Sequence, residues 1–212
     1  MRASHQVVLK PVEPGDAPGA SPSSASPASY VTKYRLKHGL EITIRPICPA
    51  DEPLMIKFHR TLSEQSVYFR YLGQLKLSQR IAHQRLMRVC LDHQESELAL
   101  VAERKYPHNG ESEILGVGRL IKADDAREAE FALVVGDRHQ GSGLGTELLR
   151  RVIRIARDEG QLMLVGYILP DNRSMLHICE KLGFRRVHPL GDPVVRMEFN
   201  LVSVQPTEHP AN

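Results

Sequence analysis

Residues 131–146 read FALVVGDRHQGSGLGT, an apolar strand pattern that runs into a glycine-rich turn and then opens a helix. Turns of this design hold phosphate oxygens, because backbone N–H groups and the positive end of the helix point at the anion and the glycines let it come close. The same composition also suits a strand-to-helix turn with only a structural role. The segment therefore predicts an anion-binding loop, with a plain connection as the alternative.

Two familiar phosphate loops match this segment poorly. A Walker loop needs lysine and then serine or threonine after GxxxxG, whereas Gly136 to Gly141 is followed by Ser142 and Gly143. A dinucleotide fingerprint needs GxGxxG, whereas Gly141, Gly143 and Gly145 are spaced GxGxG. Neither a nucleoside triphosphate nor a dinucleotide is therefore the expected ligand.

The sequence around the loop predicts an α+β domain. Short apolar runs separated by turn residues indicate three antiparallel strands that end at the loop, and a helical apolar period follows it and stops at Gly160. In chain order we expect a strand at 41–45, helices at 51–62 and 78–90, strands at 98–102, 114–121 and 130–135, a helix at 143–159, a strand at 162–168, a helix at 174–182, and strands at 184–187 and 194–201.

The amino-terminal end has a different composition. Residues 11–29 read PVEPGDAPGASPSSASPAS, which buries too little apolar surface to offset the entropy of ordering the chain. We therefore expect a disordered Pro/Ala/Ser-rich tail at 1–30, one folded domain at 31–203 and a flexible carboxyl end at 204–212.

Composition argues against several classes of protein. The net charge of +3 is spread out and Trp is absent, so we expect no nucleic-acid partner. Cys48, Cys90 and Cys179 are far apart and form no CxxC pair, which disfavours disulfides and zinc and favours a reducing cytoplasm. The ten histidines lack metal-ligand spacing, so no metal is expected. No stretch reads as a signal peptide or a membrane span, so we expect a cytoplasmic protein with no membrane partner.

Two patterns resemble one family. Gln140-x-x-Gly143-x-Gly145 is similar to the pyrophosphate-binding pattern of the GNAT acetyltransferases, Q/R-x-x-G-x-G/A. Asn172, followed by CEKLGF at 179–184, resembles the asparagine and the (Y)E-x-x-GF ending of that family. The resemblance extends from residue 40 to 201. It implies the GNAT acyl-CoA N-acyltransferase fold, an α/β/α layered arrangement with a mixed central sheet of about seven strands flanked by helices, and acetyl-CoA as co-substrate.

The resemblance also assigns roles to residues. It implies that an amine attacks the acetyl thioester directly between the splayed fourth and fifth strands, with Glu130 as general base. A solvated glutamate at a strand entrance is the alternative for Glu130. The implied cofactor contacts are Leu133, Val134 and Val135 for the pantetheine arm, Gln140, Gly141, Ser142, Gly143, Leu144, Gly145 and Thr146 for the pyrophosphate, and Asn172 for the arm beyond the strand.

The chain departs from the family at Cys179. Many GNAT enzymes have a tyrosine there, which protonates the departing CoA thiolate. A buried helix cysteine is the favoured interpretation of Cys179, and solvent then protonates a thiolate that is already a tolerable leaving group. Arg138, Arg173 and Lys181 are candidates for the 3′-phosphate, with solvated surface charges as the alternative.

The front half narrows the expected acceptor. IRPI at 44–47 with Asp51, and LSEQSVYFRY at 62–71, resemble the acyltransferase domain of bacterial Pat-type protein lysine acetyltransferases. This implies a protein lysine as acceptor, for example on an acyl-CoA synthetase. A small-molecule amine and, from another class, a non-catalytic acyl-CoA-binding regulatory module stay open as alternatives.

Overall fold

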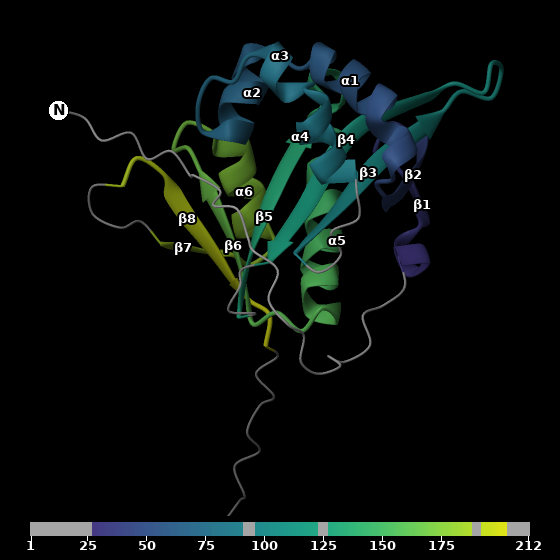
Figure 1. Ribbon diagram of the computed structural model, residues 1–212. Coiled ribbons are helices and arrows are strands. Elements are labelled where there is room, and N and C mark those ends of the chain that lie inside the picture. The colour runs from purple at the N-terminus through teal and green to yellow at the C-terminus, as the bar shows by residue number, and fades with distance from the viewer. Residues whose placement is uncertain (1–26, 91–95, 123–126, 188–191, 203–212) are drawn as a thin grey trace, which may run out of the picture.

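The computed structural model describes residues 27–90, 96–122, 127–187 and 192–202. One mixed sheet of eight strands runs through them in the order β1-β2-β3-β4-β5-β6-β8-β7 (Figure 1). Neighbouring strands are antiparallel except β5 and β6, which are parallel. The strands are β1 (Thr32–Arg35), β2 (Glu41–Pro46), β3 (Glu97–Lys105), β4 (Ser112–Lys122), β5 (Glu128–Val135), β6 (Met163–Ile168), β7 (Arg185–Val187) and β8 (Val195–Asn200).

This sheet confirms the expected α+β class, with eight strands in place of about seven. The strand absent from the expectation is β1, which folds back onto β2 through a turn that contains Gly39 at φ 84°. Only a residue without a side chain adopts that backbone angle at little cost. The four-residue strand carries no clear apolar alternation, which is why the sequence pattern did not reveal it.

The expected ends of the chain fall largely outside the described residues. The described part starts at residue 27, inside the tail expected at 1–30, and the end expected at 204–212 lies beyond it. Pro27–Tyr30 form a short 3₁₀ helix, η1, and Tyr30 is buried with its hydroxyl 3.4 Å from Asp158 Oδ2. The folded part therefore begins a few residues before position 31.

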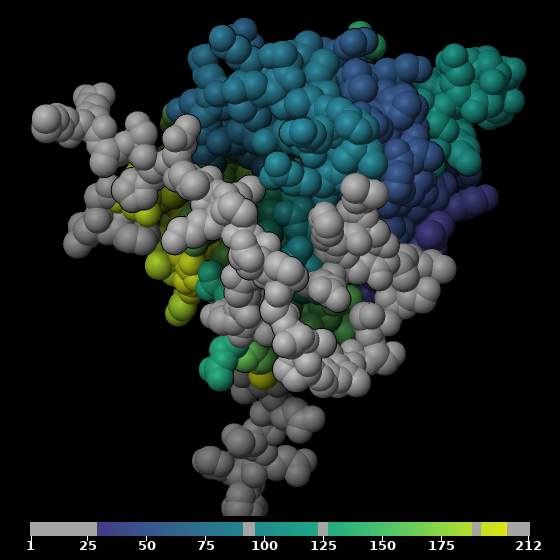
Figure 2. All heavy atoms as spheres, viewed as in Figure 1, coloured from purple at the N-terminus to yellow at the C-terminus, as the bar shows by residue number. Residues whose placement is uncertain are grey.

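Six α-helices flank the sheet in the described ranges. Figure 1 shows the first four grouped together on one side, apart from α5, and in Figure 2 they form one continuous cap, while the β3–β4 hairpin projects from the body. None of the six is both long enough and apolar enough to cross a bilayer. They are α1 (Glu52–Thr61), α2 (Glu64–Tyr71), α3 (Leu77–Arg80), α4 (His83–Cys90), α5 (Leu144–Asp158) and α6 (Arg173–Lys181).

Two hydrophobic cores hold these layers together. The larger core packs α5 and α6 against the sheet through residues such as Leu148 and Cys179. The smaller core packs α1 and α4 against the other face through residues such as Phe58 and Leu86. Along β5 the two sets alternate, because Phe131 and Val135 belong to the larger core and Val134 to the smaller one. Strand β5 thus lies between both layers.

Two helices differ from the expectation. The helix expected at 78–90 is broken into α3 and α4, and Arg80, the last residue of α3, is buried. Its guanidinium donates to the carbonyls of Leu75 and His59 at 3.2 Å and 2.8 Å. Helix α2 was not expected, because among its residues only Ser66 and Val67 are buried and no apolar stripe is present.

Candidate active site

The strands β5 and β6 separate from each other after a short parallel contact. Three residue pairs join them, the last of which is Glu130 with Val165. At Gly166 a β-carbon would lie 2.3 Å from the ring of Phe131, so the glycine makes room for this ring between the strands. Beyond it β5 continues to Val135 without pairing to β6. The V-shaped opening predicted between these two strands is therefore present.

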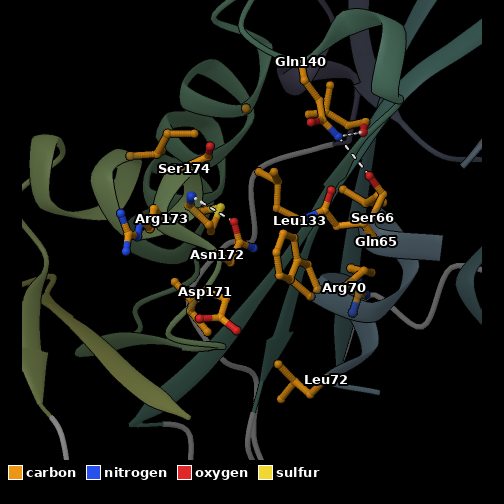
Figure 3. A pocket seen from close by; sticks show the side chains of 18 of the residues that line it. Gln65, Ser66, Arg70, Leu72, Leu133, Gln140, Asp171, Asn172, Arg173 and Ser174 are labelled. Atoms are coloured by element: carbon orange, nitrogen blue, oxygen red, sulfur yellow. Dashed lines mark hydrogen bonds between the residues drawn. The ribbon is translucent and has the colours of Figure 1, made fainter. Parts of the chain in front are cut away.

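A cavity of about 400 Å³ occupies this opening. Its walls come from α2, β5, the glycine loop, the end of β6 and the start of α6. Figure 3 shows Gln140 at one end and Leu72 at the other, with Leu133 and Asn172 between them. The cavity therefore connects the expected phosphate loop to the start of β5, where Glu130 stands.

The glycine loop is shaped to bind an anion. Gly141 and Gly143 have φ angles of 72° and 90°, which side chains rarely allow. Helix α5 begins at Leu144 without a side-chain cap bond from Gly143, and no described residue accepts a hydrogen bond from the amides of Gly141, Gly143 or Gly145. Free amides at a helix amino terminus attract phosphate. The loop thus fits a diphosphate such as that of coenzyme A.

Not every residue expected at the phosphates reaches the cavity. Gln140, Gly141 and Gly145 line it, whereas the other four loop residues do not. Ser142 is buried and its hydroxyl donates to the His139 carbonyl at 2.6 Å, and Leu144 belongs to the core. The side chains of Ser142 and Leu144 therefore hold the loop in shape. The residues outside the cavity lining are Ser142, Gly143, Leu144 and Thr146.

The side chain of Gln140 joins the loop to α2. Its amide donates to Ser66 Oγ at 3.0 Å and to the Val135 carbonyl at 3.3 Å. Asp137 adds to this connection by accepting from the backbone N–H of Ser63 at 2.9 Å and from its hydroxyl at 2.5 Å. The same carboxylate accepts from the hydroxyl of Ser66 at 2.9 Å. Four side chains thus fix the start of α2 to the loop.

The pantetheine residues and Asn172 line the cavity as expected. Leu133, Val134 and Val135 are part of its β5 wall. The Asn172 carbonyl oxygen accepts from the Met175 amide at 3.2 Å and so caps α6. The side-chain nitrogen Nδ2 of Asn172 has no acceptor among the described residues, which leaves it able to donate to a carbonyl in the cavity. These placements agree with the expected roles, and the roles themselves stay predictions.

Glu130 lines the cavity and is half-buried. Burial raises the pKa of Glu130 above its ordinary value, while the positive charges of Arg70 and Arg119 act in the opposite direction. Arg119 is paired with Glu97. Arg70 lines the cavity itself and has no ion-pair partner in the described chain. A carboxylate with a raised pKa in a cleft is a candidate general base.

Cys179 lies in the core and not in the cavity lining. It is fully buried, and burial raises the pKa of its thiol to about 12. The thiol is therefore not exposed to the cavity. This placement supports the interpretation of Cys179 as a packing residue.

Sequence reasoning did not assign five of the residues that line the cavity. Gln65, Phe69 and Arg70 come from α2, Leu72 follows the last residue of that helix, and Tyr167 comes from β6. The one readable signal for α2 was Ser63 followed by an acidic residue, a common helix start, and the Ser63 hydroxyl does accept from the Ser66 amide. Of the residues suggested for the 3′-phosphate, Arg173 lines the cavity and Arg138 and Lys181 do not. No group of three metal-binding side chains occurs in the described ranges.

Comparison with known proteins agrees with this geometry. Residues 41–185 match the family model of the acetyltransferase (GNAT) domain. Acetyltransferase PA5475 of Pseudomonas aeruginosa is 30% identical over 149 residues, which cover 70% of this chain and 77% of that protein.

Two solved structures show the same fold. The GNAT domain of S. lividans PAT has a TM-score of 0.72 and 26% identity, over 83% of this chain and 99% of that one. Spermidine N-acetyltransferase from Vibrio cholerae, in complex with CoA and spermine, has a TM-score of 0.59 and 18% identity, over 76% and 95%. The chain therefore belongs to the GNAT family of acetyltransferases and uses acetyl-CoA as co-substrate.

Proposed function

We propose that this acetyltransferase transfers the acetyl group of acetyl-CoA directly to the side-chain amine of a protein lysine, with Glu130 as general base. The observation that carries the proposal is that Glu130 and the glycine loop share one cavity. The pantetheine arm of acetyl-CoA is long, with the diphosphate at one end and the thioester at the other. A cleft with a phosphate-binding loop at one end and a base at the other suits this molecule, because the thioester then lies where the base can deprotonate the attacking amine. The likeness to the GNAT domain of S. lividans PAT supports a protein acceptor.

The residues divide the chemistry as follows. Gln140, Gly141 and Gly145 lie where the diphosphate binds, and Asn172 faces the arm. Glu130 takes the proton that the attacking ammonium must lose, because a lysine amine near pKa 10.4 is almost fully protonated at neutral pH. A backbone N–H of β5 in the opening donates to the thioester carbonyl oxygen as negative charge develops on it.

The products follow from one substitution. The new C–N bond forms, the C–S bond breaks, and the released thiolate takes a proton from solvent. An acid side chain is not essential, since a thiol with a pKa near 8.5 leaves readily. Cys179 is not required in this scheme, which agrees with its position in the core.

A small amine with a second positive charge is the alternative acceptor. Asp171 lines the cavity, and its carboxylate suits a second ammonium group of a polyamine. A non-catalytic acyl-CoA-binding module is less well supported, because Glu130 stands inside the cavity. We propose a cytoplasmic location, since all three cysteines are free thiols.

Intact-protein mass spectrometry tests the proposal. Acyl-CoA synthetases and a broad protein panel are incubated with acetyl-CoA and either the wild-type chain or the Glu130→Gln variant. We expect a gain of one acetyl group on a lysine with the wild type, at a rate reduced by about 10²–10⁴ in the variant. No mass gain on any protein, together with turnover of spermidine, would replace the protein acceptor with a small amine.

A further inference from the structure

Helix α2 ends on a leucine in a left-handed backbone conformation. Leu72 has φ 54° and ψ 28°, and its N–H donates to the Tyr68 carbonyl. It is the only residue other than glycine with a positive φ in the described chain. Glycine or asparagine is the usual residue at such a position, because a β-carbon crowds the following carbonyl there. Leucine is therefore an unfavourable choice for the backbone.

The folded core does not account for this choice. The Leu72 side chain is 41% exposed and belongs to neither hydrophobic core. It lines the cavity instead, at the end opposite Gln140 (Figure 3). Strained residues that are not needed for packing occur where the side chain serves a ligand. The unfavourable backbone conformation of Leu72 therefore accompanies a side chain that lines this end of the cavity.

A second exposed apolar side chain lines the same cavity from β6. Seven large hydrophobic side chains are exposed in the described chain, and only Leu72 and Tyr167 among them line the cavity. Tyr167 is 37% exposed, and its hydroxyl accepts a hydrogen bond from Arg196 Nη1 at 2.8 Å, which fixes the ring. Phe69 lines the cavity as well. Leu72, Tyr167 and Phe69 therefore give apolar contacts in a cavity whose walls also carry polar groups, among them the carboxylate of Glu130.

We propose that Leu72 and Tyr167 hold the alkyl stem of the acceptor, so that the amine at its tip reaches Glu130, and that Leu72 determines the preference for amines on long unbranched stems. The inference rests on the proposed acetyl transfer and names the chemistry of its acceptor. The four methylenes of a lysine side chain match the apolar side chains of Leu72 and Tyr167, and its ammonium group matches the carboxylate of Glu130, because the stem is apolar and the head group is charged. Leu72 lies far from the loop that holds the diphosphate, so its contacts concern the acceptor alone.

Steady-state kinetics with a lysine-containing peptide and with methylamine separates stem binding from chemistry. Leu72→Gly keeps the backbone conformation and removes the side chain. We expect its KM for the peptide to rise about tenfold, the effect of one half-exposed leucine contact. The KM for acetyl-CoA and the rate with methylamine should match the wild type. Leu72→Met should restore the peptide KM, and Leu162→Ala, which removes a leucine of similar exposure outside the cavity lining, should change nothing.

Three results would overturn the inference. They are a wild-type peptide KM in Leu72→Gly, an equal KM rise for acetyl-CoA, and an equal effect in the Leu162→Ala control. If Leu72→Gly does not fold, Leu72→Asn carries the same test, because asparagine tolerates this backbone conformation.

Failure of the protein-lysine proposal gives a different pattern. In that case the wild type leaves the peptide unmodified and acetylates spermidine, whose amine also sits on an alkyl stem. Leu72→Gly should then raise the KM for spermidine and not for methylamine. A wild type that acetylates neither amine would refute both proposals.

Discussion

A methyl group at position 166 should destabilise the chain and close the opening between β5 and β6. A β-carbon on Gly166 would lie 2.3 Å from both Cε1 and Cζ of Phe131, whereas ordinary contacts begin at 3.4 Å. The ring therefore has to move by about 1 Å. It has little room to do so, because Phe131 is 5% exposed and its ring packs edge-on against Phe184 at a centroid distance of 5.3 Å.

We expect Gly166→Ala to reduce the free energy of unfolding by about 2 kcal/mol, the middle of the range for overpacked cores. For a domain of this size that lowers Tm by ~4–8 °C. Phe131 lines the same cavity as Leu133, so the displaced ring should also weaken binding of coenzyme A. Thermal unfolding by circular dichroism and calorimetric titration with coenzyme A measure the two effects.

Two further variants show whether the collision is the cause. Gly118→Ala adds the same methyl group where the nearest atom, Val152 Cγ2, is 3.4 Å away, and should lower Tm much less. Combining Gly166→Ala with Phe131→Leu should recover part of the loss, because the two side chains compete for one space. A Gly166→Ala protein as stable as the wild type, or a Gly118→Ala protein equally destabilised, would refute the packing account.

Three other predictions concern charged and buried groups. Burial raises the pKa of Glu130 and the charge of Arg70 lowers it. Arg70→Gln should therefore move the acidic limb of the kcat/KM profile to higher pH. An unshifted profile would show that Arg70 does not act on the group that titrates. Burial opposes ionisation of Asp137, yet the hydrogen bonds from Ser63 hold the pKa of Asp137 below its ordinary value. These bonds therefore stabilise the fold at any pH above the ordinary aspartate pKa. The stabilisation is lost as the pH falls through the lowered pKa of the folded chain. Asp137→Asn should lower stability by about 1 kcal/mol at neutral pH, a small value because the group is partly exposed, and the difference from the wild type in urea unfolding should vanish in acid. Cys179→Ala should leave kcat unchanged, since the thiol is buried with a pKa of about 12; a large drop in steady-state rate would contradict its placement in the core.

The elements with a clear apolar period were predictable from sequence. Seven of the strands and helices such as α5 and α6 lie where alternation and helical spacing place them. Helix α2 and the break before α4 were not predictable from sequence, and the reason is physical. Helix α2 buries little apolar surface, and Arg80 is a charged side chain whose burial depends on distant carbonyls. Local patterns carry no information about partners of that kind.

The candidate site also has parts that were predictable from sequence and parts that were not. The glycine loop was readable because positive φ angles and a helix start leave a mark on the local sequence. That Ser142 points inward was not readable, since its partner is a backbone carbonyl set by the folded turn. The proposed acceptor end was also hidden, because Leu72 and Tyr167 are far apart in the sequence and line one cavity only in the folded chain.

Helix α2 ties the two ends of the site together. Its first turn is bonded to the loop through Asp137 and Gln140, while Arg70 in its last turn and Leu72 just after it line the proposed acceptor end. Eight residues of helix span about 12 Å, so a single rigid element separates the expected diphosphate from the expected acceptor. Val67 is its one buried apolar side chain, so the hydrogen bonds to the loop add to limited core packing in holding the helix. The loop expected to bind the cofactor is therefore bonded to the helix that leads to Arg70 and Leu72.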